Sequence, residues 1–366
     1  MFIQHLYKSF LYIFQSYQKA SRLVIYNVIL GYGSAILSVI LIYTGVVTDF
    51  KCIYYGTNSV YLVMAIFNLI LVSKEFNLKA TFRKEFLFKI VPISLPLIPV
   101  YLTEGLLKKS GIFFLRMFTD LEQIGNYSIV MKLSGLLLVL RATLQYFWYS
   151  TTSRLIQNED PDKFKHFANI VFKNFFSLII LGLIFFTIYI KDLILLLTNK
   201  SYMVTIIPSI IVCYGYGFLI FSSLYNGILY AMAKTKKIFY SNVIGALVTF
   251  TSAYFFVKYA GLIGAALSMT LGNFVLFAFM AMFFKKDVPD KFNFKFENGS
   301  KHFIISLLFL TLSIFSHIYF IATPWVLRSI GLIIICFYTY ICYTFNFISI
   351  KKIIKGVKSN LSRVRG

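Results

Sequence analysis

The sequence predicts an all-α membrane protein that crosses the bilayer about ten times, and three observations predict this fold class. The 366 residues are 59% hydrophobic and only 13% charged, about half the charged fraction of a soluble domain. The mean hydropathy is +0.78. Apolar runs of 18 or more residues recur along the whole chain, and each can cross a hydrocarbon core of about 30 Å as a helix. A membrane barrel would instead alternate polar and apolar residues with period two.

Ten apolar segments are interpreted as full transmembrane helices, and short loops connect them. They are 24–46, 53–73, 90–115, 126–148, 171–190, 204–230, 238–257, 262–283, 303–320 and 328–346. Residues 1–18 are interpreted as the end of one further helix, present only in part.

Two segments of the chain are approximate copies of each other, 215 residues apart with one single-residue gap. The first copy contains Lys19, Asn27, Gly45 and Gly56, and the second contains Lys234, Asn242, Gly261 and Gly272. Many transporters are built from two related halves of this kind. The repeat therefore predicts two pseudo-symmetric helical lobes.

The repeat also predicts how the chain is organised. Carried backward, it puts the start of the first lobe about 125 residues before Met1, so the first lobe is expected to lack three helices and part of a fourth. We predict that 1–80 is the remaining part of the first lobe and that 81–284 is a second lobe of six helices. An extra helix pair (285–350) and a basic cytoplasmic tail (351–366) are expected to follow.

The net charge of +23 is explained by topology. If the N-terminus is cytoplasmic, the inner segments hold 25 Lys and Arg residues and the outer segments hold five. This alternation is the positive-inside pattern of a multi-pass membrane protein with both termini in the cytoplasm. The location of the charges argues against a nucleic-acid partner.

The sequence contains no pattern typical of an enzyme or of a cofactor site. The four cysteines and four histidines are scattered, with no metal-ligand spacing. The carboxylates are too few for a paired acid and base. Asp120 and Asp192 stand singly near helix ends, where helix capping is the favoured role. We expect no catalytic residue, no metal and no cofactor.

The segment 90–115 concentrates unusual residues. Pro92, Pro96 and Pro99 remove backbone donors, so they predict a bend, either a static kink or one that moves when a cavity opens.

Charged residues follow these prolines. Glu104 and Lys108 are spaced for an i,i+4 ion pair, which is the favoured interpretation; the alternative is a role in ion coupling. Lys109 and Arg116 are seven residues apart and share a helix face. They could present positive charge to an anionic ligand such as a pyrophosphate.

The segment 126–148 carries Lys132 and Arg141. Nine residues at 100° each put them on opposite faces of a straight helix, so both cannot line one narrow cavity unless the helix bends. Arg141 could also extend to the cytoplasmic surface. Lys132 is therefore the stronger candidate for substrate binding.

Three motifs resemble the polysaccharide-biosynthesis flippases of the multidrug/oligosaccharidyl-lipid/polysaccharide exporter superfamily. The segment 86–99 resembles the start of their seventh helix, 124–133 resembles their glycine–tyrosine–serine–lysine segment, and 260–266 resembles their turn between helices eleven and twelve. The extra helix pair resembles that of fourteen-helix members. Where many members have an acidic–basic pair in helix seven, this chain has Gly111 and Ile112, which puts an ion-pair role at those positions in doubt.

The resemblance implies a flippase of the bacterial inner membrane for an undecaprenyl-pyrophosphate-linked oligosaccharide, which works in O-antigen or capsule synthesis by alternating access. Its expected partners are this lipid-linked oligosaccharide, membrane lipids and other polysaccharide-assembly membrane proteins. Three alternatives stay open: a non-functional remnant, a multidrug exporter of the same superfamily, and, in third place, a polysaccharide polymerase or membrane acyltransferase. An exporter of cations would favour an acidic cavity, and a polymerase would favour a large outer loop; the outer segments here are short.

Overall fold

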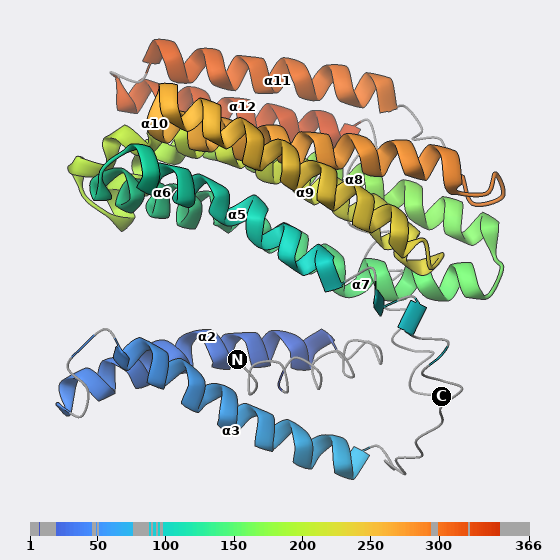
Figure 1. Ribbon diagram of the computed structural model, residues 1–366. Coiled ribbons are helices and arrows are strands. Elements are labelled where there is room, and N and C mark those ends of the chain that lie inside the picture. The colour runs from blue at the N-terminus through green and yellow to red at the C-terminus, as the bar shows by residue number, and fades with distance from the viewer. Residues whose placement is uncertain are drawn as a thin grey trace. The chain divides into compact units, whose positions relative to one another are not determined.

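A computed structural model gives the architecture of the chain. The residues it describes are Tyr7, 20–45, Asp49, 51–75, Phe88, 91–92, 94–95, 98–293, 299–320 and 323–344. All regular structure in these residues is helical, which confirms the predicted fold class (Figure 1). The chain divides into two compact units, Met1–Phe88 and Lys89–Gly366. The predicted helix 1–18, apart from Tyr7, and the predicted tail 351–366 lie outside the described residues.

The first unit contains a pair of packed helices, α2 (Ala20–Tyr43) and α3 (Lys51–Glu75). Gly45, just after α2, has a φ of +68°, a left-handed conformation that favours glycine. Gly56 of α3 lies against Ser38 of α2 so closely that a methyl group would overlap the serine oxygen. The two glycines therefore provide the turn and the close helix contact of this pair.

The second unit repeats this device in α10 (Thr235–Asp287). Gly261 has a φ of +51° and breaks the helix, so α10 is a hairpin of two helices. Gly272 of the second arm packs against Thr249 of the first, again with no room for a methyl group. The ends of the hairpin meet, because Lys237 Nζ lies 3.4 Å from the Asp287 carboxylate. Gly261 and Gly272 are the residues that the sequence repeat pairs with the two glycines of the first unit, and their geometry agrees with that repeat.

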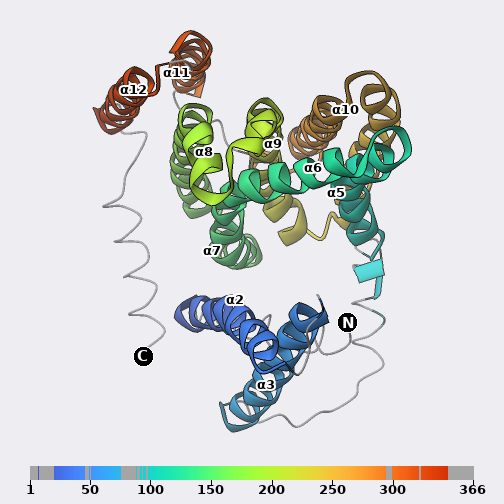
Figure 2. The same cartoon turned by 90° about the vertical axis from the view of Figure 1, so that its left-hand side faces the viewer.

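In the second unit, α6, α7, α8 and α10 lie around α9 (Figure 2). In chain order the unit contains α5 (Ile98–Phe118), α6 (Leu121–Ser134), the 3-10 turn η2 (Gly135–Leu137), α7 (Leu138–Gln157), α8 (Pro161–Leu197), the 3-10 segment η3 (Lys200–Thr205), α9 (Ile206–Ala231), α10, α11 (Gly299–Phe320) and α12 (Pro324–Thr344). Most predicted spans of this part of the chain fall on one helix each. The span 126–148 is divided between α6 and α7 by η2, and the spans 238–257 and 262–283 form the two arms of α10. α8 extends beyond its predicted span because its first turn is polar and therefore lies outside the apolar run. Asp160 is the N-cap of α8, and Pro161 is its first residue. The hydrogen bond from Lys163 lowers the pKa of this exposed carboxyl, which keeps the cap ionised.

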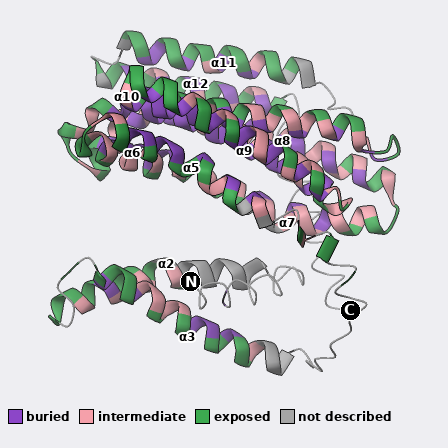
Figure 3. Ribbon diagram, in the orientation of Figure 1, coloured by how far each residue is buried: buried purple, intermediate pink, exposed green. Residues whose placement is uncertain are grey.

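α9 is the packing centre of this unit, since it contacts α6, α7, α8 and α10 and has buried residues along most of its length (Figure 3). Two apolar clusters form the core. One includes Leu137 and Ile220, and the other includes Leu144 and Leu224. α11 and α12 pack together and against α8. The bundle therefore has two apolar layers, with the residues between 137 and 144 at their boundary.

Six helices of the described chain are long and apolar enough to cross a membrane. They are Lys51–Leu71, Leu121–Gln157, Pro161–Leu197, Lys200–Ala231, Thr235–Asp287 and Trp325–Thr344. Two shorter apolar helices, Tyr32–Tyr43 and Phe303–Tyr319, accompany them. Many large apolar side chains on these helices are exposed, as a lipid environment requires. The chain is a polytopic α-helical membrane protein.

Candidate substrate-translocation site

A helix break separates the two basic residues of the 126–148 segment. Asp120 caps α6 by accepting from the Gln123 backbone at 2.9 Å, as expected for this residue. The helix then tightens into the 3-10 turn η2 before α7 begins, a feature that frequently marks a hinge. Lys132, before the break, is exposed. Arg141, after it, points into the bundle with 15% of its side chain exposed.

Arg141 ties three helices together. Its guanidinium donates to the Glu104 carboxylate of α5 at 3.2 Å and to the Ser223 hydroxyl of α9 at 3.0 Å. Glu104 has 32% of its side chain exposed. Tyr149 of α7 is buried near this pair and interacts electrostatically with both of its members. Arg141 and Ser223 lie in the chain between the residues of the two apolar clusters, so this polar contact is at the boundary between the two layers.

This contact corrects two expectations. The ion-pair partner of Glu104 is Arg141, not Lys108, because the arginine fork can bind the carboxylate and Ser223 together, whereas the lysine amine can stay hydrated. Arg141 does not extend to the membrane surface either. The sequence gives no sign of this pairing, since the two residues lie 37 positions apart on different helices.

Four basic residues of α5 and α6 are exposed and have no ion pair among the described residues: Lys108, Lys109, Arg116 and Lys132. Lys132 lies opposite the buried side of α6, which contains Asn126, Tyr127 and Val130. Arg116 is in the last turn of α5, where it also faces the negative end of the helix dipole.

The structure describes two of the three prolines of the segment 90–115, Pro92 and Pro99. Pro99 is in the first turn of α5, where a missing backbone donor costs little. Pro92 lies before α5, and Pro96 lies outside the described residues. The predicted helix 90–115 is described as α5 from Ile98 onward, and part of 90–97 lies outside the described residues. A bend within the predicted helix stays a prediction.

Gly111 explains why an acidic residue does not fit at this position of the fold. A Cβ atom there would lie 2.8 Å from the hydroxyl of Tyr127 on α6. The tyrosine ring is fully buried, so it occupies the space that a larger side chain would need. The small residue at position 111 is therefore matched by a large one, Tyr127, in α6.

A second ion pair attaches the extra helices. Arg328 of α12 binds both carboxylate oxygens of Asp192 on α8, at 2.5 and 3.0 Å. Tyr189 of α8 donates to the Arg328 carbonyl at 3.1 Å. Asp192 thus joins two helices and is not a helix cap, contrary to the expectation from its position.

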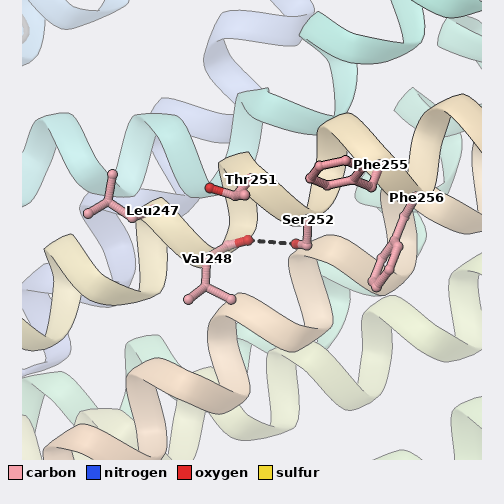
Figure 4. Close-up of a pocket in the computed structure, with 6 residues that line it drawn as sticks. All are labelled: Leu247, Val248, Thr251, Ser252, Phe255 and Phe256. Atoms are coloured by element: carbon pink, nitrogen blue, oxygen red, sulfur yellow. Dashed lines mark hydrogen bonds between the residues drawn. The ribbon is translucent and has the colours of Figure 1, made fainter.

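Other site types have little support. The described residues contain no group of three or more potential metal ligands. A shallow apolar groove is lined by residues of α10 alone: Leu247, Val248, Thr251, Ser252, Phe255 and Phe256 (Figure 4). The Ser252 hydroxyl is bonded to the Val248 carbonyl at 2.6 Å. This exposed face therefore fits lipid contact better than recognition of a charged substrate.

The fold is similar to two kinds of solved structure. The lipid II flippase MurJ, in its inward closed conformation, superposes with a TM-score of 0.60 at 16% identity, covering 85% of this chain and 66% of that one. MATE in the straight conformation gives a TM-score of 0.57 at 17% identity, covering 73% and 63%. A proline-to-alanine mutant of MATE gives 0.57 at 16% identity, covering 73% and 62%.

The chain thus spans less than two thirds of the length of these neighbours. No protein-family model and no curated protein matches it. The likeness to these structures concerns the fold, which this chain shares with MurJ and MATE.

Proposed function

We propose that this protein is a flippase that moves an undecaprenyl-pyrophosphate-linked oligosaccharide across the bacterial inner membrane for O-antigen or capsule synthesis. Two observations support the proposal. The fold is similar to that of a lipid II flippase. The helices α5 and α6, which the sequence predicts to lie in the membrane, also carry the exposed bases Lys108, Lys109 and Lys132, while the nearest carboxylate in α5, Glu104, is neutralised by Arg141.

The excess of positive charge in α5 and α6 is the observation from which we infer the class of substrate. A cation inside a membrane is costly and marks a functional site by default. A pyrophosphate crossing the bilayer needs counter-charges, and charge-assisted hydrogen bonds from lysine or arginine provide them. Lys132 would bind the pyrophosphate or an acidic sugar, and Lys109 and Arg116 would assist. Arg141, bonded to two partners, would position α5 and α7.

Alternating access supplies the mechanism. Two lobes rock about a central site, which opens first to the cytoplasm and then to the outer face. These helices would bend at two places next to the cationic residues, the proline-containing segment that leads into α5 and the 3-10 turn η2 between α6 and α7. Other polysaccharide-assembly membrane proteins would supply and receive the lipid-linked sugar.

A multidrug exporter is the second candidate, because MATE also shares the fold. The two candidates differ in the charge of the site. A site for cationic drugs would present carboxylates, whereas α5 and α6 of this chain present lysines without carboxylate partners among the described residues. Neither kind of neighbour is an enzyme, which agrees with the expectation that the protein is not one.

Complementation of a flippase-deficient strain tests the proposal. The chain should restore surface polysaccharide, and Lys132→Ala should reduce it about tenfold or more, since loss of one charged hydrogen bond is worth about 1.5–3 kcal/mol. Lys132→Arg should retain most of the activity. The matched control is Lys258→Ala, which removes an exposed lysine of α10 and should have little effect. Full activity of the Lys132→Ala variant would remove this residue from the site, and failure of the unaltered chain to complement would contradict the function.

A further inference from the structure

Lys108 is exposed although both of its neighbours on the same face of α5 contact other helices. It lies four positions after Glu104 and three before Gly111, so the three residues share one helix face. Glu104 binds Arg141 of α7, and Gly111 lies against Tyr127 of α6. The side chain of Lys108, between these two contacts, is exposed. The interface of α5 with α6 and α7 therefore leaves this lysine accessible to solvent or to a ligand.

Lys108 is also in the middle of its helix. α5 has 21 residues, from Ile98 to Phe118, and at 1.5 Å per residue Lys108 lies about 15 Å from either end. The sequence predicts that this helix crosses the membrane, and a lysine at that depth is costly unless water or a counter-charge reaches it. An accessible ammonium in this position therefore favours a site for an anion.

Glu104 is the carboxylate that would be expected to neutralise Lys108. A glutamate four residues before a lysine is the favoured order for an ion pair on a helix. In the part of the chain that the structure describes, however, the Glu104 carboxylate is bound by Arg141 at 3.2 Å, and no ion pair joins it to Lys108. Arg141 is fixed by a second bond, from its Nε to the Ser223 hydroxyl at 3.0 Å. The guanidinium therefore neutralises the carboxylate that could compete for the lysine.

We propose that Lys108 binds the anionic headgroup of the substrate, and that Arg141 keeps Lys108 available by holding Glu104. The identity of the headgroup, a pyrophosphate, rests on the proposed function. The Lys108 ammonium would donate charge-assisted hydrogen bonds to its phosphate oxygens. Arg141 is a positioning residue here, because it acts through Glu104 and does not contact the substrate. A released Glu104 would pair with Lys108 and would also repel the anion.

Binding of inorganic pyrophosphate to the purified full chain in lipid nanodiscs tests the inference. Calorimetry should give a Kd about tenfold or more higher for Lys108→Ala, the effect of losing one charged hydrogen bond. Lys108→Arg keeps the charge and should change the Kd little. The matched control is Lys258→Ala, which removes an exposed lysine of α10 and should leave the Kd unchanged. Because Lys108 is exposed, its variants should fold, and thermal unfolding checks this.

Variants of the ion pair distinguish the positioning role of Arg141 from a purely structural one. Arg141→Gln should raise the Kd about tenfold, because the released carboxylate competes for Lys108. Adding Lys108→Ala to it should then cost little more. Adding Glu104→Gln to Arg141→Gln should bring the Kd back to within about threefold of the unaltered chain. That recovery should vanish when Lys108→Ala is also present, whereas a recovery of packing alone would not depend on the lysine.

Three results would overturn the inference. One is a Kd for Lys108→Ala equal to that of the unaltered chain, or no binding of pyrophosphate to either. Another is a recovery in the Glu104→Gln, Arg141→Gln variant that persists without Lys108. The third is no recovery at all in that folded variant, which would show that Arg141 itself binds the anion. The Lys108 variants decide the site even where the Arg141 variants do not fold.

Complementation of the flippase-deficient strain by the same variants separates this inference from the proposed function. Normal complementation by Lys108→Ala would overturn the role of Lys108 and leave the flippase in place. An unaltered chain that binds pyrophosphate through Lys108 but does not complement would support the anion site and contradict the flippase.

Discussion

At the scale of single residues, membrane burial decides which charges pair. Arg141 has five donors in a fixed fork, and Glu104 and Ser223 accept from two edges of it. Lys108 has one flexible ammonium that can reach water. An unpaired guanidinium at the same depth would be destabilising. The long-range pair is therefore preferred over the local i,i+4 pair, which the sequence spacing alone favours.

A double-mutant cycle tests this pairing. Glu104→Gln and Arg141→Met should each destabilise the protein by about 1–3 kcal/mol, because each leaves a half-buried charged or polar partner. The double variant should lose less than the sum, with a coupling energy of about 1–2 kcal/mol. Thermal unfolding of the purified protein in detergent measures all three.

The control for this cycle is Lys108→Met. Its ammonium is exposed and has no ion pair among the described residues, so the change should stay within about 0.5 kcal/mol. Strict additivity of the Glu104 and Arg141 variants, or a larger coupling of Glu104 to Lys108, would contradict the observed geometry.

At the scale of elements, the sequence predicts the helices well and their interruptions poorly. Apolar length alone places the spans, because a bilayer fixes how many apolar residues a helix needs. The turn at Gly261 was predicted, because it falls in the gap between the apolar spans 238–257 and 262–283. The break at 135–137 was not predicted, because the apolar run 126–148 continues through it. The ion pair between Asp192 and Arg328 could not be predicted either, because α12 is far from α8 in the chain.

Two glycines with different surroundings predict opposite effects of a glycine-to-alanine substitution. Gly111→Ala should destabilise the protein by about 1–3 kcal/mol, because the new methyl group would lie 2.8 Å from the Tyr127 hydroxyl. Gly125→Ala in α6 should be neutral or stabilising by up to about 1 kcal/mol, since nothing lies within 4 Å and alanine favours the helix. Thermal unfolding measures both.

The rescue variant for Gly111→Ala is Tyr127→Phe, which removes the closest atom. It should recover part of the lost stability, because the ring carbons remain 3.0 and 3.1 Å from the added methyl group. If Gly111→Ala and Gly125→Ala behave alike, the close packing of α5 on α6 is wrong.

At the scale of the whole molecule, the distribution of charge predicts an orientation in the membrane. The structure fixes one relation that this orientation must satisfy. Lys237 and Asp287 bring the two ends of the α10 hairpin together, so Lys285 lies at that end and Lys258 lies near the turn at Gly261. The two lysines must therefore be on opposite sides of the bilayer, and the positive-inside pattern predicts that Lys285 is cytoplasmic.

Cysteine labelling in intact cells decides the orientation. In the Cys336→Ser background, Lys258→Cys should react with a membrane-impermeant maleimide added outside, whereas Lys285→Cys should react only after permeabilisation. Both positions are exposed, so access to the reagent depends on the side of the membrane and not on burial. The reverse labelling pattern would show that the protein has the opposite orientation in the membrane. The basic loops would then lie outside the cell, contrary to the positive-inside pattern. Labelling of both positions from one side would contradict the α10 hairpin itself, since a hairpin that crosses the bilayer twice cannot have its turn and its ends on the same surface.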